Sequence, residues 1–137
     1  MKPFEGIEVL VWPMQPTELQ GLLHTIARLG FQLRSVQSCA EFRRAIDRGS
    51  AALAIAQISH TYQEPLQFLA EVGPSVQLPP TLIVSASLDV DMYLEAMQRG
   101  AYDCMGTDPD EKELVRIAAA ALKARHGCLT SSGGPGR

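Results

Sequence analysis

Short apolar runs alternate along the chain with longer stretches in which apolar positions repeat at helical spacing. The runs 9–12, 53–56 and 82–84 contain no polar residue, which is typical of parallel strands covered by helices on both faces. Two weaker strands are expected. Residues 31–36 (FQLRSV) alternate apolar and polar positions as an edge strand does, and residues 102–105 (YDCM) follow a glycine. The pattern predicts five strands.

Five amphipathic helices are predicted between and after these strands, because each intervening segment carries an apolar stripe with a helical period. The stripes consist of Leu19, Leu22, Leu23, Ile26 and Leu29; Phe42, Ala45 and Ile46; Leu66, Leu69 and Ala70; Val90, Tyr93, Leu94 and Met97; and Leu114, Ile117, Ala118, Ala121 and Leu122. Each stripe is expected to face the core.

Residues that start and stop helices support this pattern. Ser38 followed by Glu41 has the spacing of a capping box. The segment 108–111 (DPDE) offers an N-cap with proline at the first helical position. Gly30, Gly49 and Gly100 lie where helices are expected to end. The predicted order of elements is therefore (βα)5.

Five βα units with short connections predict an open, doubly wound α/β sheet, since right-handed crossovers place helices on both faces. The expected strand order is 2-1-3-4-5, the flavodoxin-like arrangement. Sites in such sheets form beyond the carboxyl ends of the strands, which points to the loops 13–16, 57–62 and 85–89. We expect one domain over residues 1–126 and a flexible tail or linker stub over the glycine-rich residues 127–137.

Composition excludes several classes of function. The 137 residues are 46% hydrophobic and carry a formal net charge of -3, so the net charge provides no overall attraction for nucleic acid, and binding of nucleic acid by this domain alone is not expected. Cys39, Cys104 and Cys128 are widely spaced, which argues against a metal site or a disulfide framework. No apolar stretch approaches the ~18 residues of a membrane span, and no signal peptide is visible. We expect a cytoplasmic protein without a cofactor or metal.

The stretch 95–105 (EAMQRGAYDCM) resembles the fourth helix and fifth strand of response-regulator receiver domains (CheY-like), which often read EAMKAGAYDFL. The segments VLVWPMQP, GFQLRSVQSCAEFRRAI and TLIVSAS also resemble the corresponding receiver segments, so the resemblance covers residues 7 to about 125. It implies the receiver fold and a role related to two-component, phosphorelay signal transduction.

The residues that carry receiver chemistry are mostly replaced. Receivers hold Mg²⁺ with an acid pair after the first strand, phosphorylate an aspartate at the end of the third strand, and use a lysine and a Ser or Thr around the phosphoryl group. By the resemblance, these positions fall on Pro13 and Met14, Gln57, Thr107 and Ser85, and the aromatic switch position falls on Cys104. Only Ser85 keeps a matching type. No Asp or Glu occurs between Gly49 and Glu64, so the sequence predicts a pseudo-receiver without phosphotransfer.

Two hypotheses of function remain. The first is a phosphorylation-independent, non-enzymatic interaction module that docks a signalling protein, or a second copy as a homodimer, through the fourth helix, fifth strand and fifth helix. By resemblance, its candidate interface residues are Leu94, Gln98, Tyr102, Arg116 and Ala120. The alternative is a small-ligand sensor or enzyme that uses a neutral pocket of Trp12, Met14, Gln57 and Ser85. An enzyme needs an acid, base or nucleophile pair in these loops, and Ser85, His60 and Asp89 have no spacing that defines a triad.

Ordinary structural roles also explain three of these residues. A strand-end hydroxyl such as Ser85 commonly hydrogen-bonds nearby backbone. Trp12, together with Met14, is expected to fill the volume that a solvated acidic pocket would occupy. Cys104 has no cationic neighbour in the sequence to lower its pKa, so a role as a small core residue is expected.

Overall fold

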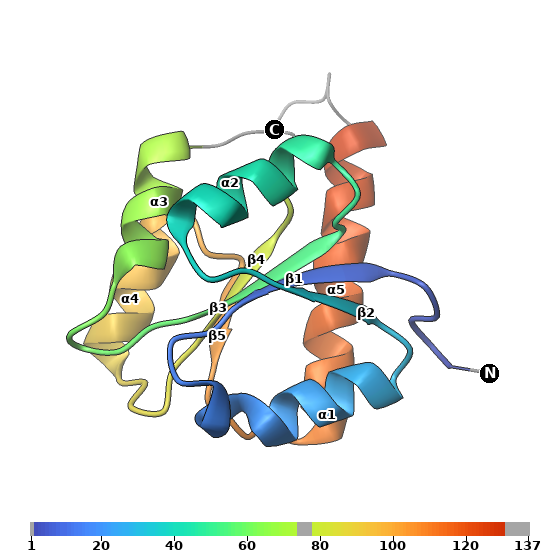
Figure 1. Ribbon diagram of the computed structural model, residues 1–137, viewed down its shortest axis with the longest axis horizontal. Coiled ribbons are helices and arrows are strands. Elements are labelled where there is room, and N and C mark those ends of the chain that lie inside the picture. The colour runs from blue at the N-terminus through green and yellow to red at the C-terminus, as the bar shows by residue number, and fades with distance from the viewer. Residues whose placement is uncertain (1, 74–77, 131–137) are drawn as a thin grey trace.

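A five-stranded parallel sheet forms the centre of the computed structural model, which describes residues 2–73 and 78–130, with side chains described up to residue 124. The elements are β1 (Glu8–Trp12), a short 3₁₀ helix η1 (Pro16–Leu19), α1 (Gln20–Arg28), β2 (Gln32–Ser35), α2 (Cys39–Arg48), β3 (Leu53–Gln57), α3 (Glu64–Val72), β4 (Thr81–Val84), α4 (Val90–Arg99), β5 (Asp103–Met105) and α5 (Glu111–Thr130). The strand order is β2-β1-β3-β4-β5 (Figure 1). The predicted flavodoxin-like fold is confirmed.

The predicted helix boundaries are confirmed at several caps. The Ser38 hydroxyl accepts a hydrogen bond from the Glu41 amide, as a capping box requires. Gly49 and Gly100 end α2 and α4 with φ of 76° and 116°, in the left-handed region that glycine adopts without strain. The start of α5 was predicted wrongly. The helix begins at Glu111, so Pro109 precedes it rather than occupying its first helical position.

The carboxyl-terminal end of the chain was expected to be a tail over residues 127–137. The last helix, α5, continues to Thr130 and therefore includes the first residues of that segment. Residues 131–137 lie outside the described residues, and the domain boundary stays a prediction.

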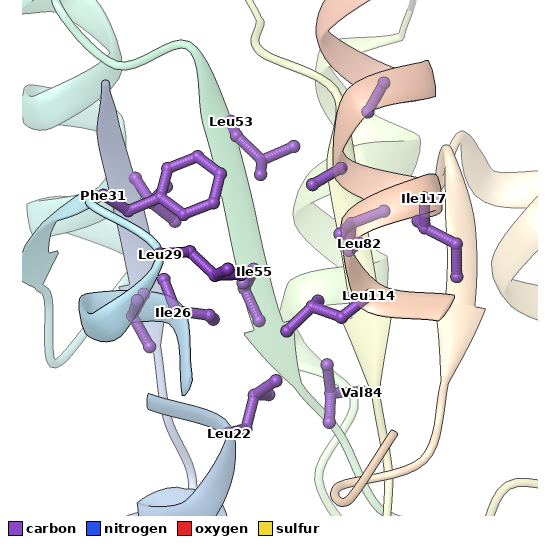
Figure 2. Packing of buried hydrophobic residues seen from close by; sticks show 14 of the residues in the cluster. Leu22, Ile26, Leu29, Phe31, Leu53, Ile55, Leu82, Val84, Leu114 and Ile117 are labelled. Carbon is purple, nitrogen blue, oxygen red and sulfur yellow. The ribbon is translucent and has the colours of Figure 1, made fainter. Parts of the chain in front are cut away.

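Two hydrophobic clusters lie on opposite faces of the sheet. On the first face, Leu53, Ile55, Leu82 and Val84 of β3 and β4 lie between α1 and α5 (Figure 2). On the second face, Leu10, Trp12, Ala54, Ala56 and Ile83 pack against α2, α3 and α4. Because side chains alternate along a strand, each central strand contributes to both clusters. All five residues of β3 are buried, which explains why its first four residues form a continuous apolar run.

The orientation of α4 differs from the sequence prediction. Met92 and Ala96 face the core, while the predicted stripe residues Val90, Tyr93 and Leu94 are 72%, 39% and 50% exposed. The Asp89 carboxylate accepts a hydrogen bond from the Met92 amide and fixes the first turn of this helix. As a result, α4 presents large apolar side chains to the surface.

The sheet has two edges with different neighbours. The β2 edge carries four exposed residues, and β5 is the edge strand at the other side, paired with β4. No described helix is both long and apolar enough to cross a bilayer.

Candidate functional site at the carboxyl ends of the strands

Gln57 occupies the carboxyl end of β3 and is completely buried. Its side-chain oxygen Oε1 accepts hydrogen bonds from the backbone amides of Met14 and Gln15, each at 2.8 Å. Its Nε2 donates to Glu18 Oε1 at 2.7 Å. The amide therefore joins the end of β3 to the β1–α1 loop and to η1.

This arrangement uses the side chain of Gln57 as an internal hydrogen-bonding group. A carboxamide supplies an acceptor oxygen and a donor nitrogen at once, and both are engaged here. A carboxylate at the same place would face Glu18 without a donor for it. The position thus favours a neutral amide, which is not a nucleophile toward phosphorus.

Glu18 is the acid that bonds to Gln57, and no motif in the sequence marks it as part of this site. Glu18 lies in η1, one turn beyond the loop, and its side chain is solvent-exposed. Pro13 and Met14, which the resemblance pairs with the receiver acids, are partly buried and carry no side-chain oxygen. Within residues 2–73 and 78–124, no group of three or more His, Cys, Asp or Glu side chains is arranged to hold a metal ion.

Trp12 at the end of β1 is fully buried in an aromatic cluster. Its ring lies 5.1 Å from Phe42 and 6.5 Å from Phe68, centroid to centroid. Its Nε1 donates to the Tyr62 hydroxyl at 3.0 Å, and that hydroxyl donates to Glu64 at 3.3 Å. Burial raises the pKa of Tyr62 above its ordinary value, so the phenol remains a proton donor to Glu64 at neutral pH. Trp12 fills volume, as predicted, and is also anchored by a hydrogen bond.

Ser85 and Thr107 are not joined to this network. Ser85 is buried after β4, and its Oγ accepts a hydrogen bond from the Ser87 amide at 3.2 Å, which confirms the predicted local backbone contact. Thr107 lies in the β5–α5 loop and is partly buried. Among the described residues, no hydrogen bond connects either side chain to Gln57. Within the described residues, the side chains of Gln57, Ser85 and Thr107 are therefore not joined by hydrogen bonds.

Cys104, which the resemblance pairs with the receiver switch residue, is a partly buried side chain in β5 that packs against the second cluster. Burial, together with the carboxylate of Asp103, raises the pKa of its thiol to about 11. The thiol is consequently protonated at neutral pH and is a poor nucleophile. This agrees with a packing role for Cys104.

The remaining two candidates from the loops form an exposed pair. His60 in the β3–α3 loop lies with Nε2 3.5 Å from Asp89 Oδ2, and both side chains are more than half exposed. No nucleophile is hydrogen-bonded to this pair in the described residues, since Ser85 binds Ser87. The loops hold no arrangement resembling a catalytic triad.

The five candidate interface residues lie around β5. Leu94, Gln98, Arg116 and Ala120 are exposed on α4 and α5, which cover opposite faces of the sheet next to this edge strand. Tyr102 precedes β5 and packs partly buried against the first cluster. Val90 and Tyr93 were missed as surface residues because their helical spacing was interpreted as a core stripe.

A parallel five-stranded sheet of this order is the fold of response-regulator receiver domains. No protein-family model matches the sequence. A curated relative, the transcriptional regulatory protein GltR of Pseudomonas aeruginosa, is 29% identical over 109 residues, covering 77% of this chain and 45% of GltR. The chain therefore spans less than half the length of this relative.

Solved structures show the same fold at lower sequence identity. NtrX of Brucella abortus in complex with ADP superposes with a TM-score of 0.76 and 18% identity over 93% of this chain and 29% of that chain. A receiver domain protein of Clostridium thermocellum superposes with a TM-score of 0.71 and 18% identity, covering 88% of this chain and 97% of that chain. The signal receiver domain of NarL from Mycobacterium tuberculosis superposes with a TM-score of 0.69 and 20% identity, covering 87% of this chain and 98% of that chain. The chain has the receiver fold.

Proposed function

We propose that this protein is a phosphorylation-independent signalling module of the receiver type, which acts by docking a protein partner through α4, β5 and α5. It performs no catalysis and uses no cofactor. The setting that fits such a module is a two-component pathway in the cytoplasm, in keeping with the receiver fold and with a structural neighbour described as a two-component response regulator from Clostridium difficile.

The hydrogen bonds of Gln57 carry the first half of the proposal. In a receiver the end of β3 must present a free carboxylate near a bound cation. Here the end of β3 presents a buried amide whose oxygen and nitrogen are both engaged by the protein itself. The same bonds hold the β1–α1 loop in one position, so the module needs no phosphoryl group to order that loop.

The exposed apolar side chains of α4 support the second half. Val90, Tyr93 and Leu94 are three of the four large hydrophobic residues that are exposed in the described part of the chain. Large apolar groups gathered on one helix favour a protein-protein contact. Arg116 on α5, whose guanidinium lies 3.8 Å from Glu113, adds a charged group at the far side of the same edge.

The alternative of a small-ligand site in the neutral pocket has less support. Trp12, Gln57 and Ser85 are buried, and each of their polar side-chain groups is bonded to another part of the protein. A ligand would have to displace these bonds before it could use the same groups. The geometry favours a filled strand end over a binding pocket.

Phosphotransfer is tested by intact-mass measurement after incubation with acetyl phosphate and Mg²⁺. We expect no phospho-adduct on the parent protein or on Gln57→Asp, because Pro13, Met14 and Thr107 still supply neither metal ligands nor a lysine. A receiver domain that retains its aspartate is the positive control. A stoichiometric adduct that maps to the loops near Gln57 in the parent protein would refute phosphorylation independence.

Docking is tested first with a second copy as the partner, by sedimentation velocity over a range of concentrations. The variant carries Val90→Glu and Leu94→Glu, and its control carries Gln67→Glu and Ala70→Glu, an equal charge change on exposed positions of α3. We expect self-association in the parent and the control, unaffected by acetyl phosphate, and its loss in the variant. Tyr102 is avoided because it packs partly against the core. Association that survives in the Val90, Leu94 variant would place the interface elsewhere.

A further inference from the structure

A groove lies on the opposite side of the molecule from β5, between the exposed edge of β2 and α2. It has a volume of about 250 Å³ and is lined by Arg34, Ser35, Val36, Glu41, Arg44 and Arg48. Because β2 and β5 are the two ends of the sheet, this groove is separate from the α4–β5–α5 surface. Three of its six lining side chains are guanidinium groups.

The charges in this groove are only partly balanced. Arg34 donates through Nε to Glu8 Oε2 at 2.8 Å, and Glu41 accepts from the Gln37 amide at 2.7 Å within the α2 capping box. Arg44 and Arg48 are exposed and make no ion pair or hydrogen bond with any residue that the structure describes. The groove thus holds two free cations in a chain whose formal net charge is -3.

The outer edge of β2, beside this groove, also has unpaired backbone groups. The Gln32 amide donates to Ile7 O and the Val36 amide to Val11 O, both on the side of β1. Backbone groups alternate in direction along a strand, so those of Leu33 and Ser35 point away from the sheet. They form no hydrogen bond within the described residues. An exposed strand edge of this kind is a template for another strand.

We propose that this groove binds an extended acidic peptide segment of a partner protein, which adds to β2 as a further strand and places carboxylates on Arg44 and Arg48. The spacing fits. Two residues four apart on a helix are separated by about 6 Å along its axis, and alternate side chains of a strand are separated by about 6.6 Å. Carboxylates at alternate positions can therefore reach both guanidinium groups, while the peptide backbone pairs with Leu33 and Ser35.

The test measures fluorescence anisotropy of labelled peptides with the whole chain. The probe is a short peptide of alternating Glu and Thr, compared with a Gln-Thr peptide and with a Glu-Thr peptide that is N-methylated along one edge. The protein variant carries Arg44→Glu and Arg48→Glu. Its control carries Lys112→Glu and Lys123→Glu, the same charge change on exposed positions of α5. A milder Arg44→Gln, Arg48→Gln pair removes the charges without adding new ones, and circular dichroism checks that each variant is folded.

We expect saturable binding of the Glu-Thr peptide that falls at least about tenfold in both Arg44, Arg48 variants and less than about threefold in the control. Binding should weaken with salt, and the Gln-Thr and N-methylated peptides should both bind more weakly. No binding to the parent protein, or equal binding to variant and control, would overturn the proposal. Equal binding of the N-methylated peptide, or full competition by inorganic phosphate, would show an anion site without strand addition and would also overturn it.

Discussion

Replacing Gln57 with methionine tests whether the buried amide holds the β1–α1 loop in place. Methionine has nearly the volume and the unbranched shape of glutamine, so the variant keeps the packing at the end of β3. It removes both acceptor bonds from the Met14 and Gln15 amides and the donor bond to Glu18. The expected loss of stability therefore comes from hydrogen bonds and not from a cavity.

The size of this loss follows from the three bonds. A typical intramolecular hydrogen bond contributes about 1 kcal/mol net, and a bond to a charged group contributes more when it is buried. Glu18 is exposed, so its bond is counted as an ordinary one. We expect the free energy of unfolding to fall by about 2–4 kcal/mol, a large share of the roughly 5–15 kcal/mol that stabilises a domain.

Urea denaturation measures this difference, with Gln67→Met as the matched control because Gln67 is exposed on α3. The control should change the free energy of unfolding by less than about 0.5 kcal/mol. The slope of the urea dependence should be equal in both variants. A loss in Gln57→Met as small as that of the control would show that the amide network does not stabilise the loop, and the first half of the proposed function would lose its basis.

Three further outcomes are expected. Tyr62→Phe leaves the buried indole N–H of Trp12 without its partner and should lower the free energy of unfolding by about 1–3 kcal/mol; no loss in urea denaturation would contradict this. Because the thiol pKa of Cys104 is raised to about 11, a variant with Cys104 as its only cysteine should react slowly with a disulfide reagent at neutral pH and faster as the pH rises; a rate independent of pH is the opposing result. Gly30→Ala should destabilise the protein, since φ of Gly30 is +106° and a Cβ would lie 2.9 Å from Glu5 N. Gly21→Ala meets open space in α1 and should stabilise the protein by about 0.5–1 kcal/mol. Thermal melts in which Gly30→Ala is the more stable variant would refute this.

The sequence predicted the architecture because its central strands are buried on both faces. An apolar run such as 53–56 fits best in the middle of a helix-covered sheet, and the glycines after the helices mark the connections. The orientation of α4 was beyond reach by the same reasoning. Apolar residues occupy several faces of this helix, so its sequence alone does not select Met92 and Ala96 over Val90 and Tyr93. Contacts with the rest of the fold decide that choice.

The sequence shows which side chains stand at the ends of the strands, but not which groups they contact. That Pro13, Met14 and Gln57 carry no carboxylate is visible in the sequence. The partners of Gln57 are not, because Met14 and Glu18 lie 43 and 39 residues away along the chain. The groove of Arg34, Arg44 and Arg48 likewise depends on how β2 lies beside α2.

Trp12 gives this protein a built-in optical reporter at the end of β1. It is the chain's one tryptophan, it is fully buried against Phe42 and Phe68, and its indole nitrogen is hydrogen-bonded to Tyr62. Two residues further along, the backbone amide of Met14 is bonded to Gln57. Loss of the ring packing on Phe42 and Phe68 or of the Tyr62 hydrogen bond would expose the indole to water and shift its emission to longer wavelength. The conformation of the strand ends can thus be followed in solution without any attached dye.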